Sequence, residues 1–304
     1  MIYTVTLNPS LDYIIDVKHF EPGMVNRTTA EKIFAGGKGI NVSMVLKNLG
    51  FDSTALGFLA GFTGKEIERQ LEEKEISTDF ICLEDGISRI NMKIRSEVES
   101  EINGLGPEIS SEAIKKMFDR LDELQEGDIL VLAGSIPASM PESMYRDIMK
   151  RLADRKLKIA VDATKSLLLN VLPFHPFVIK PNNHELGELF NVKIKSKDQA
   201  VEYAKKLQEM GAQNVIVSMA GEGAVFVGDD GSVFQSEAPK GTVVNSVGAG
   251  DSMVAGFLAG YLGEGDYKEA FKLGVCTGSA SAFSEQLATR EQVDAIRNTH
   301  HFQF

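Results

Sequence analysis

Cysteine, histidine and long apolar runs are all scarce in this sequence. Its 304 residues include two cysteines and five histidines. No apolar run approaches the roughly 18 residues that a membrane-spanning helix needs. Cys82 and Cys276 lie far apart and form no C-x-x-C pair, which argues against a redox motif or a zinc site. The histidines show no metal-ligand spacing. Two free thiols are typical of a protein in a reducing cytoplasm, so we expect a cytoplasmic protein without a membrane span.

Basic residues are fewer than acidic ones. Lys plus Arg number 32 and Asp plus Glu number 43, so the formal net charge is −11. A charge of that sign argues against a nucleic acid or an anionic membrane as a partner. A small anionic ligand is still compatible with it, because a pocket can be locally basic on an acidic protein. The first ten residues have no basic region, and Asn8-Pro9 interrupts their apolar run, so we expect no secretory signal.

Two familiar phosphate-binding motifs are missing. The pattern G-x-x-x-x-G-K-[ST] has no match, since Lys65 follows a glycine but precedes Glu66. The pattern G-x-G-x-x-G fails as well, because Met253 stands where the third glycine should follow Gly248 and Gly250. These absences argue against a Walker-type ATPase and against a simple dinucleotide-binding dehydrogenase.

Apolar strands and amphipathic helices alternate along most of the chain. This alternation predicts βαβ units and an α/β fold with a mainly parallel sheet. In such a sheet, ligands bind outside the carboxyl ends of the strands. The predicted strands cover residues 2–7, 54–59, 128–133, 158–162, 177–179 and 214–218, with a hairpin over 224–227 and 232–235. The predicted helices cover residues 40–49, 66–74, 114–124, 141–152, 184–190, 199–210, 251–262 and 267–284.

Residues 80–103 differ from the rest, because charged residues are interleaved with the apolar ones in three short strand-like runs. That pattern is typical of a half-exposed antiparallel sheet. Together with residues 11–34, this segment predicts a small sheet outside the main body. The predicted α/β core then comprises residues 1–10, 35–79 and 104–304.

A Gly-rich segment opens the predicted helix 251–262. Gly248 and Gly250 permit a tight turn and let backbone amides approach a ligand closely. A helix N-terminus also favours an anion. The segment is therefore either a Gly-rich loop with Asp251 as a helix cap, or an anion hole for a transferring phosphoryl group with Asp251 beside it as a base.

A second Gly-rich segment opens the predicted helix 40–49. Gly37, Lys38 and Asn41 place backbone amides, an ammonium group and a carboxamide together. Such a set suits a polyhydroxylated or phosphorylated ligand. The plainer alternative is a Gly-Gly turn beside a solvated lysine.

A third segment, residues 180–185, follows a predicted strand directly. Asn182 and Glu185 have the spacing of a helix cap pair. The functional alternative places Lys180 near phosphates, and Asn182 and Glu185 on the hydration shell of Mg²⁺, which keeps several waters when bound to proteins.

The three segments, taken in order, resemble the ribokinase/PfkB family of sugar kinases. That family carries a Gly-Gly motif near the N-terminus, an N-x-x-E element and a G-A-G-D motif near the C-terminus, and the resemblance covers essentially the whole chain. It implies a ribokinase-like three-layer α/β/α fold with a small β-sheet lid made from residues 11–34 and 80–103. It also implies ATP and Mg²⁺ as cofactors and a homodimer formed through the lid.

Within the family, residues 6–12 resemble the branch that phosphorylates sugar phosphates. Residues 25–27, 88–93 and 101–108 are most similar to members that convert fructose 1-phosphate to fructose 1,6-bisphosphate. Tagatose 6-phosphate and fructose 6-phosphate remain alternative substrates. A nucleoside or unphosphorylated-sugar kinase, and a non-catalytic ligand-binding regulator, are the more distant alternatives.

The resemblance also implies roles for single residues. Asp251 would be the general base, and the anion hole would be formed by Gly248, Ala249 and Gly250. The positions that match those for the sugar hydroxyls are Asp12, Gly37 and Asn41. The candidates to hold the substrate's existing phosphate are Arg27, Lys38, Arg89 and Lys93. Ser135 follows a predicted strand and is a further candidate to face the substrate.

The nucleotide-binding positions that the resemblance implies are Ser218, Gly221 and Gly223, with Lys180 near the phosphates. Here the sequence departs from the family pattern. The family commonly reads S-L-G-A-E-G-A, whereas this chain has Ala220 followed by Gly221. A methyl group at residue 220 could change how closely the backbone approaches the nucleotide.

Overall fold

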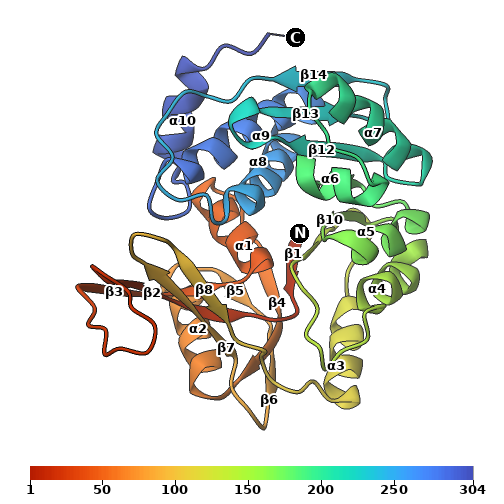
Figure 1. The fold of residues 1–304 in the computed structure, drawn as a ribbon. Coiled ribbons are helices and arrows are strands. Elements are labelled where there is room, and N and C mark those ends of the chain that lie inside the picture. Colours follow the sequence, from red (N-terminus) through yellow and green to blue (C-terminus); the bar gives the residue numbers. More distant parts are fainter. Residues whose placement is uncertain (304) are drawn as a thin grey trace.

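The central strands of the main sheet are almost entirely buried. All five residues of the strand Ile129–Ala133 are buried and apolar, as expected for a parallel sheet covered on both faces. The computed structural model describes residues 1–303, and within that range ten strands form this sheet (Figure 1). In spatial order they are β14 (Val233–Ser236), β13 (Ala224–Val227), β12 (Asn214–Ser218), β11 (Val178–Ile179), β10 (Lys158–Asp162), β9 (Ile129–Ala133), β1 (Ile2–Thr6), β4 (Thr54–Ala60) and β5 (Ser77–Thr78), with β6 (Ile81–Leu83) also paired to β4.

The pairs from β12 to β5 are parallel, and β13 and β14 add an antiparallel hairpin at one edge. Helices cover both faces. The helices are α1 (Lys38–Asn48), α2 (Gly61–Glu73), α3 (Ser111–Leu121), α4 (Met144–Leu152), α5 (Lys165–Val171), α6 (Asn183–Phe190), α7 (Lys197–Glu209), α8 (Ala249–Glu264), α9 (Tyr267–Ala282) and α10 (Arg290–Thr299). Short 3₁₀ turns occur at Ala153–Arg155, Leu172–Phe174 and Ala220–Glu222.

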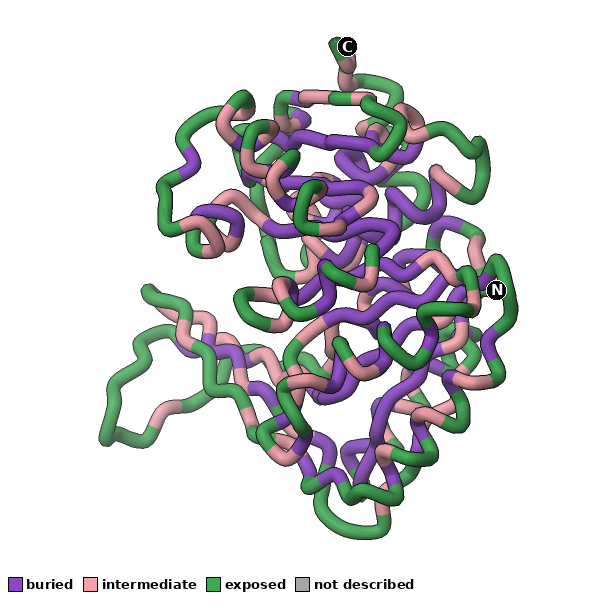
Figure 2. The backbone as a smooth tube through the Cα atoms, turned by 90° about the vertical axis from the view of Figure 1, so that its right-hand side faces the viewer, coloured by how far each residue is buried: buried purple, intermediate pink, exposed green. Residues whose placement is uncertain are grey.

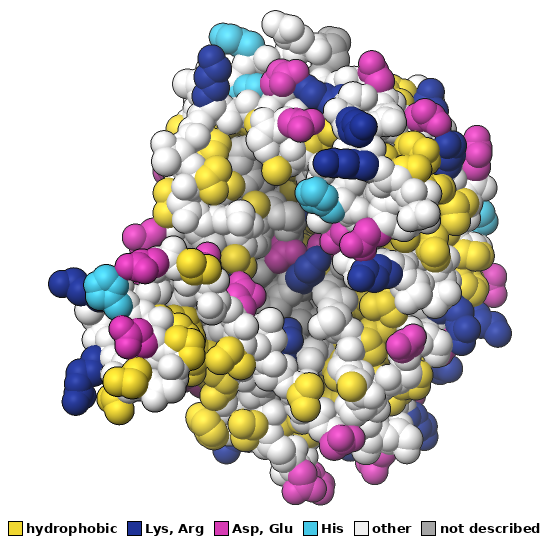
Figure 3. All heavy atoms as spheres, in the orientation of Figure 1, with side chains coloured by type: hydrophobic (Ala, Val, Ile, Leu, Met, Phe, Trp, Pro, Cys, Tyr) yellow, Lys and Arg dark blue, Asp and Glu magenta, His cyan; other side chains and the backbone are white. Residues whose placement is uncertain are grey.

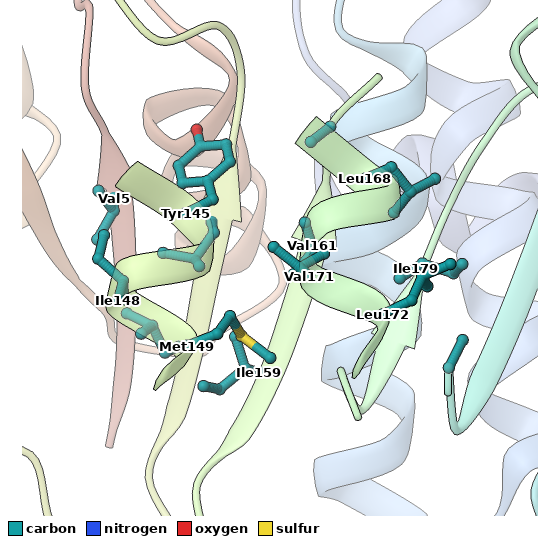
Figure 4. Packing of buried hydrophobic residues seen from close by; sticks show 14 of the residues in the cluster. Val5, Tyr145, Ile148, Met149, Ile159, Val161, Leu168, Val171, Leu172 and Ile179 are labelled. Carbon is teal, nitrogen blue, oxygen red and sulfur yellow. The ribbon is translucent and has the colours of Figure 1, made fainter. Parts of the chain in front are cut away.

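Two large apolar clusters hold the layers together. One joins the sheet to α3, α4, α5, α6 and α7, and the other joins its opposite face to α1, α8, α9 and α10. Figure 2 shows that the buried backbone is concentrated in the central strands and the segments packed on them. Figure 4 shows the first cluster at close range, with α4 and α5 packed on the sheet through Tyr145, Ile148, Met149, Leu168 and Val171. The α/β fold class is confirmed.

Four strands of the described chain form a second sheet that projects from the main body (Figure 1). It consists of β3 (Ala30–Gly36), β2 (Ser10–Asp16), β7 (Arg89–Arg95) and β8 (Ser100–Asn103), in that spatial order. Its root packs on α2 through Leu11 and Ala35, whereas the connection from β2 to β3 is exposed over most of its length. We call this sheet, with that connection, the lid.

One strand expected in the lid lies elsewhere. β6 pairs with β4 of the main sheet, so residues 81–83 belong to the core and not to the lid. The reason is packing, because Ile81 is buried in the apolar cluster that also holds Phe58 and Ala113. Sequence alternation reports which side chains are buried, but not which sheet buries them.

The other predicted elements are present, although α2 and α3 begin before their predicted starts at residues 66 and 114. β10 and β12 match their predicted bounds, and the hairpin of β13 and β14 is present. Two helices, α5 and α10, were not predicted. No helix within residues 1–303 is both long enough and apolar enough to cross a membrane.

The topology brings several distant segments to one edge. The strands β1, β9, β10 and β12 all run in the same direction in the main sheet, so their carboxyl ends lie on the same side. The hairpin of β13 and β14 follows β12 along the chain. The N-termini of α1 and α8 also face this region, since Asn41 and Asp251 contact each other directly. Ligand binding is expected at this edge of a doubly wound sheet.

Candidate active site

The N-terminus of α8 has the geometry of an anion site. Gly248 caps the helix with φ of 79°, in the left-handed region that glycine adopts freely. A side chain there would also lie 2.6 Å from Cδ2 of Leu287, so glycine is needed for space as well. The first helical turn leaves backbone N–H groups without partners inside the helix, and the helix dipole adds positive potential. This is the geometry that the predicted anion hole requires, although the backbone N–H of Ala249 donates to the backbone oxygen of Ser246 at 3.3 Å.

Asp251 lies in this first turn and is 5% exposed. Nδ2 of Asn41, on α1, donates a hydrogen bond of 2.8 Å to Oδ2 of Asp251. Burial, together with the nearby Asp162 carboxylate, raises the pKa of Asp251 to about 6, against the opposing effects of Lys38, Asn41 and Lys180. A carboxylate with such a pKa can accept a proton near neutral pH.

Two lysines flank a carboxylate beside Asp251. Nζ of Lys38 lies 3.1 Å from Oδ2 of Asp162, and Nζ of Lys180 lies 3.6 Å from Oδ1. Burial opposes ionisation of Asp162, but the two ammonium groups outweigh it and lower its pKa. Burial likewise opposes the charge on Lys38, and the carboxylates of Asp162, Asp251 and Glu185 overcome it and raise the pKa of Lys38. The ionised forms of this cluster therefore stabilise one another.

Sequence reasoning did not single out Asp162. A signal was present, because Asp162 is the last residue of a correctly predicted strand, and strand ends are where ligands bind. Gly250 also belongs to this cluster, since a Cβ there would lie 3.0 Å from Nζ of Lys180. The segment predicted as an anion hole is thus adjacent to Lys180.

The lid contributes a polar face to the site. Oδ1 of Asp12, on β2, accepts hydrogen bonds from Oγ of Ser10 at 2.8 Å and from Nδ2 of Asn91 at 3.0 Å. Nζ of Lys93 lies 3.5 Å from Oδ2 of Asp12, and Lys93 is buried. Gly36 is pressed against the same carboxylate, where a Cβ would lie 2.8 Å from it. Asp12 and Lys93 are therefore brought together, and their roles toward the sugar hydroxyls and the phosphate stay predictions.

A cavity of about 290 Å³ lies between the lid and the core. Figure 3 shows a hollow on this side of the molecule, with basic and acidic side chains along it. Its walls combine predicted and unpredicted residues: Gly37, Lys38, Arg89, Gly134 and Ser135 were predicted, whereas Thr6, Asn8, Ala133, Asp162, Ala163, Thr164 and Leu167 were not.

Arg89 is the lid's cationic contribution to this cavity. Nε of Arg89 donates to the backbone oxygen of Asn8 at 3.0 Å. Burial lowers the pKa of Arg89, and the more distant Asp12 only partly offsets this. No carboxylate within residues 1–303 forms an ion pair with Arg89. A half-buried guanidinium without an anionic partner is suited to bind an anion.

Arg27 is not brought to the cavity. It lies exposed in the connection between β2 and β3 and does not line the walls. Its predicted role in phosphate binding therefore stays a prediction.

Asn182 and Glu185 form a capping box at the start of α6. Oδ1 of Asn182 accepts from the backbone N of Glu185 at 2.8 Å, and Oε2 of Glu185 accepts from the backbone N of Asn182 at 2.8 Å. The cap pair that the spacing indicates is thus present.

The second carboxylate oxygen of Glu185, Oε1, makes no hydrogen bond within the described chain. No cluster of three or more acidic, His or Cys side chains that could ligate a metal occurs among residues 1–303. This arrangement fits Mg²⁺ held mainly by waters and phosphates.

The predicted nucleotide segment lies beside this cap. Ser218 ends β12 and forms an isolated parallel bridge with Asn182. Gly223 has φ of 96°, and a side chain there would overlap the backbone oxygen of Ser236. Ala220 is the unusual residue, because it adopts φ of 49°. Gly221 is outside the left-handed region, with open space around its Cα. The exchange of Ala and Gly therefore places a methyl group at the strained position.

Replacing Ala220 by glycine should stabilise the protein. An L-residue in the left-handed region costs about 1–2 kcal/mol, and glycine removes most of this cost. We expect Ala220→Gly to raise the free energy of unfolding by about 1 kcal/mol, measured by urea denaturation. Gly221→Ala is the matched control, and it should not destabilise. A lower stability of Ala220→Gly would contradict the strain argument.

Comparison with known proteins agrees with this geometry. Residues 5–292 match the model of the pfkB family carbohydrate kinases. The chain is 49% identical to the 1-phosphofructokinase of Bacillus subtilis (strain 168), covering 97% of both chains. It is 38% identical to a D-tagatose-1-phosphate kinase of Bacillus licheniformis, covering 97% of this chain and 96% of the other. Its fold matches that of phosphofructokinase-2 from Escherichia coli in complex with substrates and products, with a TM-score of 0.91, 27% identity and 98% of both chains covered. The chain belongs to the pfkB family of carbohydrate kinases.

Proposed function

We propose that this protein transfers the γ-phosphoryl group of ATP to the free primary hydroxyl of fructose 1-phosphate, forming fructose 1,6-bisphosphate and ADP. The hydroxyl oxygen forms the new bond to phosphorus, and the bond to the β-γ bridging oxygen breaks. The hydroxyl proton goes to Asp251. The relatives' names support a ketohexose phosphate as substrate, and the B. subtilis relative supports fructose 1-phosphate.

One observation carries the proposal: the cavity lined by the unpaired guanidinium of Arg89 also has in its wall two residues of the charged cluster around the buried Asp251. Lys38 and Asp162 line the cavity and also belong to the cluster around Asp251. Arg89 lines the cavity from the lid. A sugar phosphate placed there could direct its phosphate toward Arg89 and a hydroxyl toward Asp251. An unphosphorylated sugar would leave Arg89 without an anion.

The transferring group would be bound by the core. The N-terminus of α8 would hold the γ-phosphoryl oxygens, and Lys38 and Lys180 would neutralise developing charge. Ser218, Gly221 and Gly223 would border the nucleotide. Mg²⁺, bound to the phosphates and through water to Glu185 and Asn182, would supply further charge neutralisation.

Asp251→Asn should abolish most activity. Asparagine preserves shape and the contact with Asn41 but cannot take the proton, so kcat should fall by about 10²–10⁴-fold. In the wild type, activity should rise as the pH increases through about 6 and then level off, because the base works in its unprotonated form. Sugar phosphates also titrate near this pH, so the wild-type profile contains the titration of the substrate as well as that of Asp251. The residual activity of the variant separates the two, because it should lack the inflection that belongs to Asp251. Near-normal turnover by the variant would exclude Asp251 as the base.

A substrate panel tests the sugar. We expect the highest kcat/KM with fructose 1-phosphate, compared with tagatose 1-phosphate, fructose 6-phosphate, tagatose 6-phosphate and free fructose. Arg89→Ala should raise KM for the preferred sugar phosphate by at least tenfold, because charge-assisted hydrogen bonds to the phosphate are lost. KM for ATP should change little. A preference for a 6-phosphate would favour the alternative substrates, and an unchanged KM in Arg89→Ala would favour an unphosphorylated sugar.

A homodimer through the lid is part of the proposal, as is a cytoplasmic location, which the free Cys82 and Cys276 support. On the lid face that carries Leu11, the residues Ile33, Tyr13, Met92 and Ile102 form one row across all four strands. Ile33 is 51% exposed and Ile102 is 61% exposed. Exposed apolar strand residues of this kind favour association with a second copy.

Charged substitutions on this row should dissociate the dimer. We expect the wild type to sediment as a dimer at micromolar concentration, and Ile33→Asp/Ile102→Asp as a monomer. Val233→Asp is the control, since Val233 is an exposed apolar strand residue at the edge of the main sheet. A monomeric wild type, or a dimeric double variant, would rule out this interface.

A further inference from the structure

Asn8 lies at the junction of lid and core, between β1 and β2. It is 6% exposed and lines the cavity. Its Nδ2 donates a hydrogen bond of 3.0 Å to the backbone oxygen of Leu105, which lies on the connection from β8 to α3. Its Oδ1 is buried and has no hydrogen-bond partner within residues 1–303. The Asn8 side chain thus links two connections between core and lid, the one from β1 to β2 and the one from β8 to α3.

Gly106 is shaped for this contact. It has φ of 92°, and a Cβ at this position would overlap Oδ1 of Asn8. Only glycine allows the connection to close over Asn8 in this way. Beyond Gly106 the connection is held by Ser139, whose Oγ donates to the backbone oxygen of Pro107 at 3.2 Å and accepts from the backbone N of Ile109 at 3.3 Å.

The same connection rests on Arg89. Gly104 donates its backbone N–H to the backbone oxygen of Ile90 at 3.2 Å, and a Cβ on Gly104 would lie 3.1 Å from Cβ of Arg89. On its other side, Nε of Arg89 donates to the backbone oxygen of Asn8. Arg89 is therefore held between the Asn8 peptide and the connection that the Asn8 side chain fixes.

We propose that Asn8 is a positioning residue that aims Arg89 at the substrate's phosphate. A flexible arginine loses conformational freedom when it binds an anion, and fixing it beforehand reduces that loss. With Nε engaged by Asn8, the two terminal nitrogens of the guanidinium are left for a bidentate contact to a phosphate. This inference rests on the proposed binding of a sugar phosphate, but not on which sugar it is.

The test is a double-mutant cycle between Asn8→Ala and Arg89→Ala, read with the sugar phosphate that the wild type uses best. Asn8→Ala should raise KM for that substrate about tenfold, because a buried hydrogen bond is lost. It should leave KM for ATP unchanged and kcat within about threefold. The inhibition constant of inorganic phosphate, competing with the sugar phosphate, should rise in parallel. In the Arg89→Ala background, Asn8→Ala should have no further effect on KM.

Gly106→Ala tests the same contact from the other side, which keeps the proposal testable if Asn8→Ala does not fold. Gly127→Ala is its matched control, since Gly127 has nearly the same φ, 87°, but no atom within 4 Å of a Cβ. Both substitutions strain the backbone similarly, so only Gly106→Ala should raise KM for the sugar phosphate and weaken inhibition by phosphate.

Two results would overturn the proposal. One is a KM effect of Asn8→Ala that multiplies with that of Arg89→Ala. The other is an equal effect of Gly106→Ala and Gly127→Ala on KM. A wild type that prefers a sugar phosphate other than fructose 1-phosphate would contradict the proposed function alone, because the cycle can then be run with that substrate.

Discussion

Four charged side chains meet at one edge of the main sheet, and the arrangement of the core depends on their pairing. Lys38, Asp162, Lys180 and Asp251 come from four separate segments, and three of them are less than 10% exposed. Removing a charge from water costs several kcal/mol unless a partner compensates it. The ends of β10 and β11 and the starts of α1 and α8 must therefore meet closely. The apolar clusters on both faces of the sheet hold them there.

This charge balance also sets the chemistry. Asp162 lies between the two lysines, which stabilise its ionised form and lower its pKa. Burial raises the pKa of Asp251, although the same two lysines act to lower it. One carboxylate is thus kept ionised as a structural partner, while the other can exchange a proton. Similar groups acquire different roles because their surroundings differ. The chain carries a net charge of −11, yet Lys38 and Lys180 lie together beside Asp162.

The lid supplies what the core lacks. The core presents Asp251, the N-terminus of α8 and two ammonium groups, but the unpaired guanidinium and the Asp12 network come from the second sheet. Several crossings between lid and core converge near Asn8. The placement of Arg89 therefore depends on loop glycines, and not on the regular pairing of the strands alone.

Most of the secondary structure was predictable, and the failures have physical causes. β10 and β12 are apolar runs with clear ends, so their bounds could be read directly. α10 buries only Val293 and has few apolar residues, although the capping box of Thr289 and Gln292 marks its start. α5 has seven residues and begins at Lys165, whose φ of 52° is left-handed. Short helices whose stability comes from tertiary packing carry little local signal.

Arg89 became a candidate only through the family resemblance, whereas the sequence by itself determined the α/β class, the Gly-rich helix starts and the candidate residues Asp251 and Lys38. These depend on local properties, namely periodicity, the conformational freedom of glycine and the chemistry of side chains near strand ends. Only the tertiary structure decided that Asp162 joins the two lysines, that β6 lies in the main sheet and that Asn8 meets Gly106. Each of these is a contact between segments distant along the chain, and such contacts depend on packing, for which a single stretch of sequence carries no period or motif.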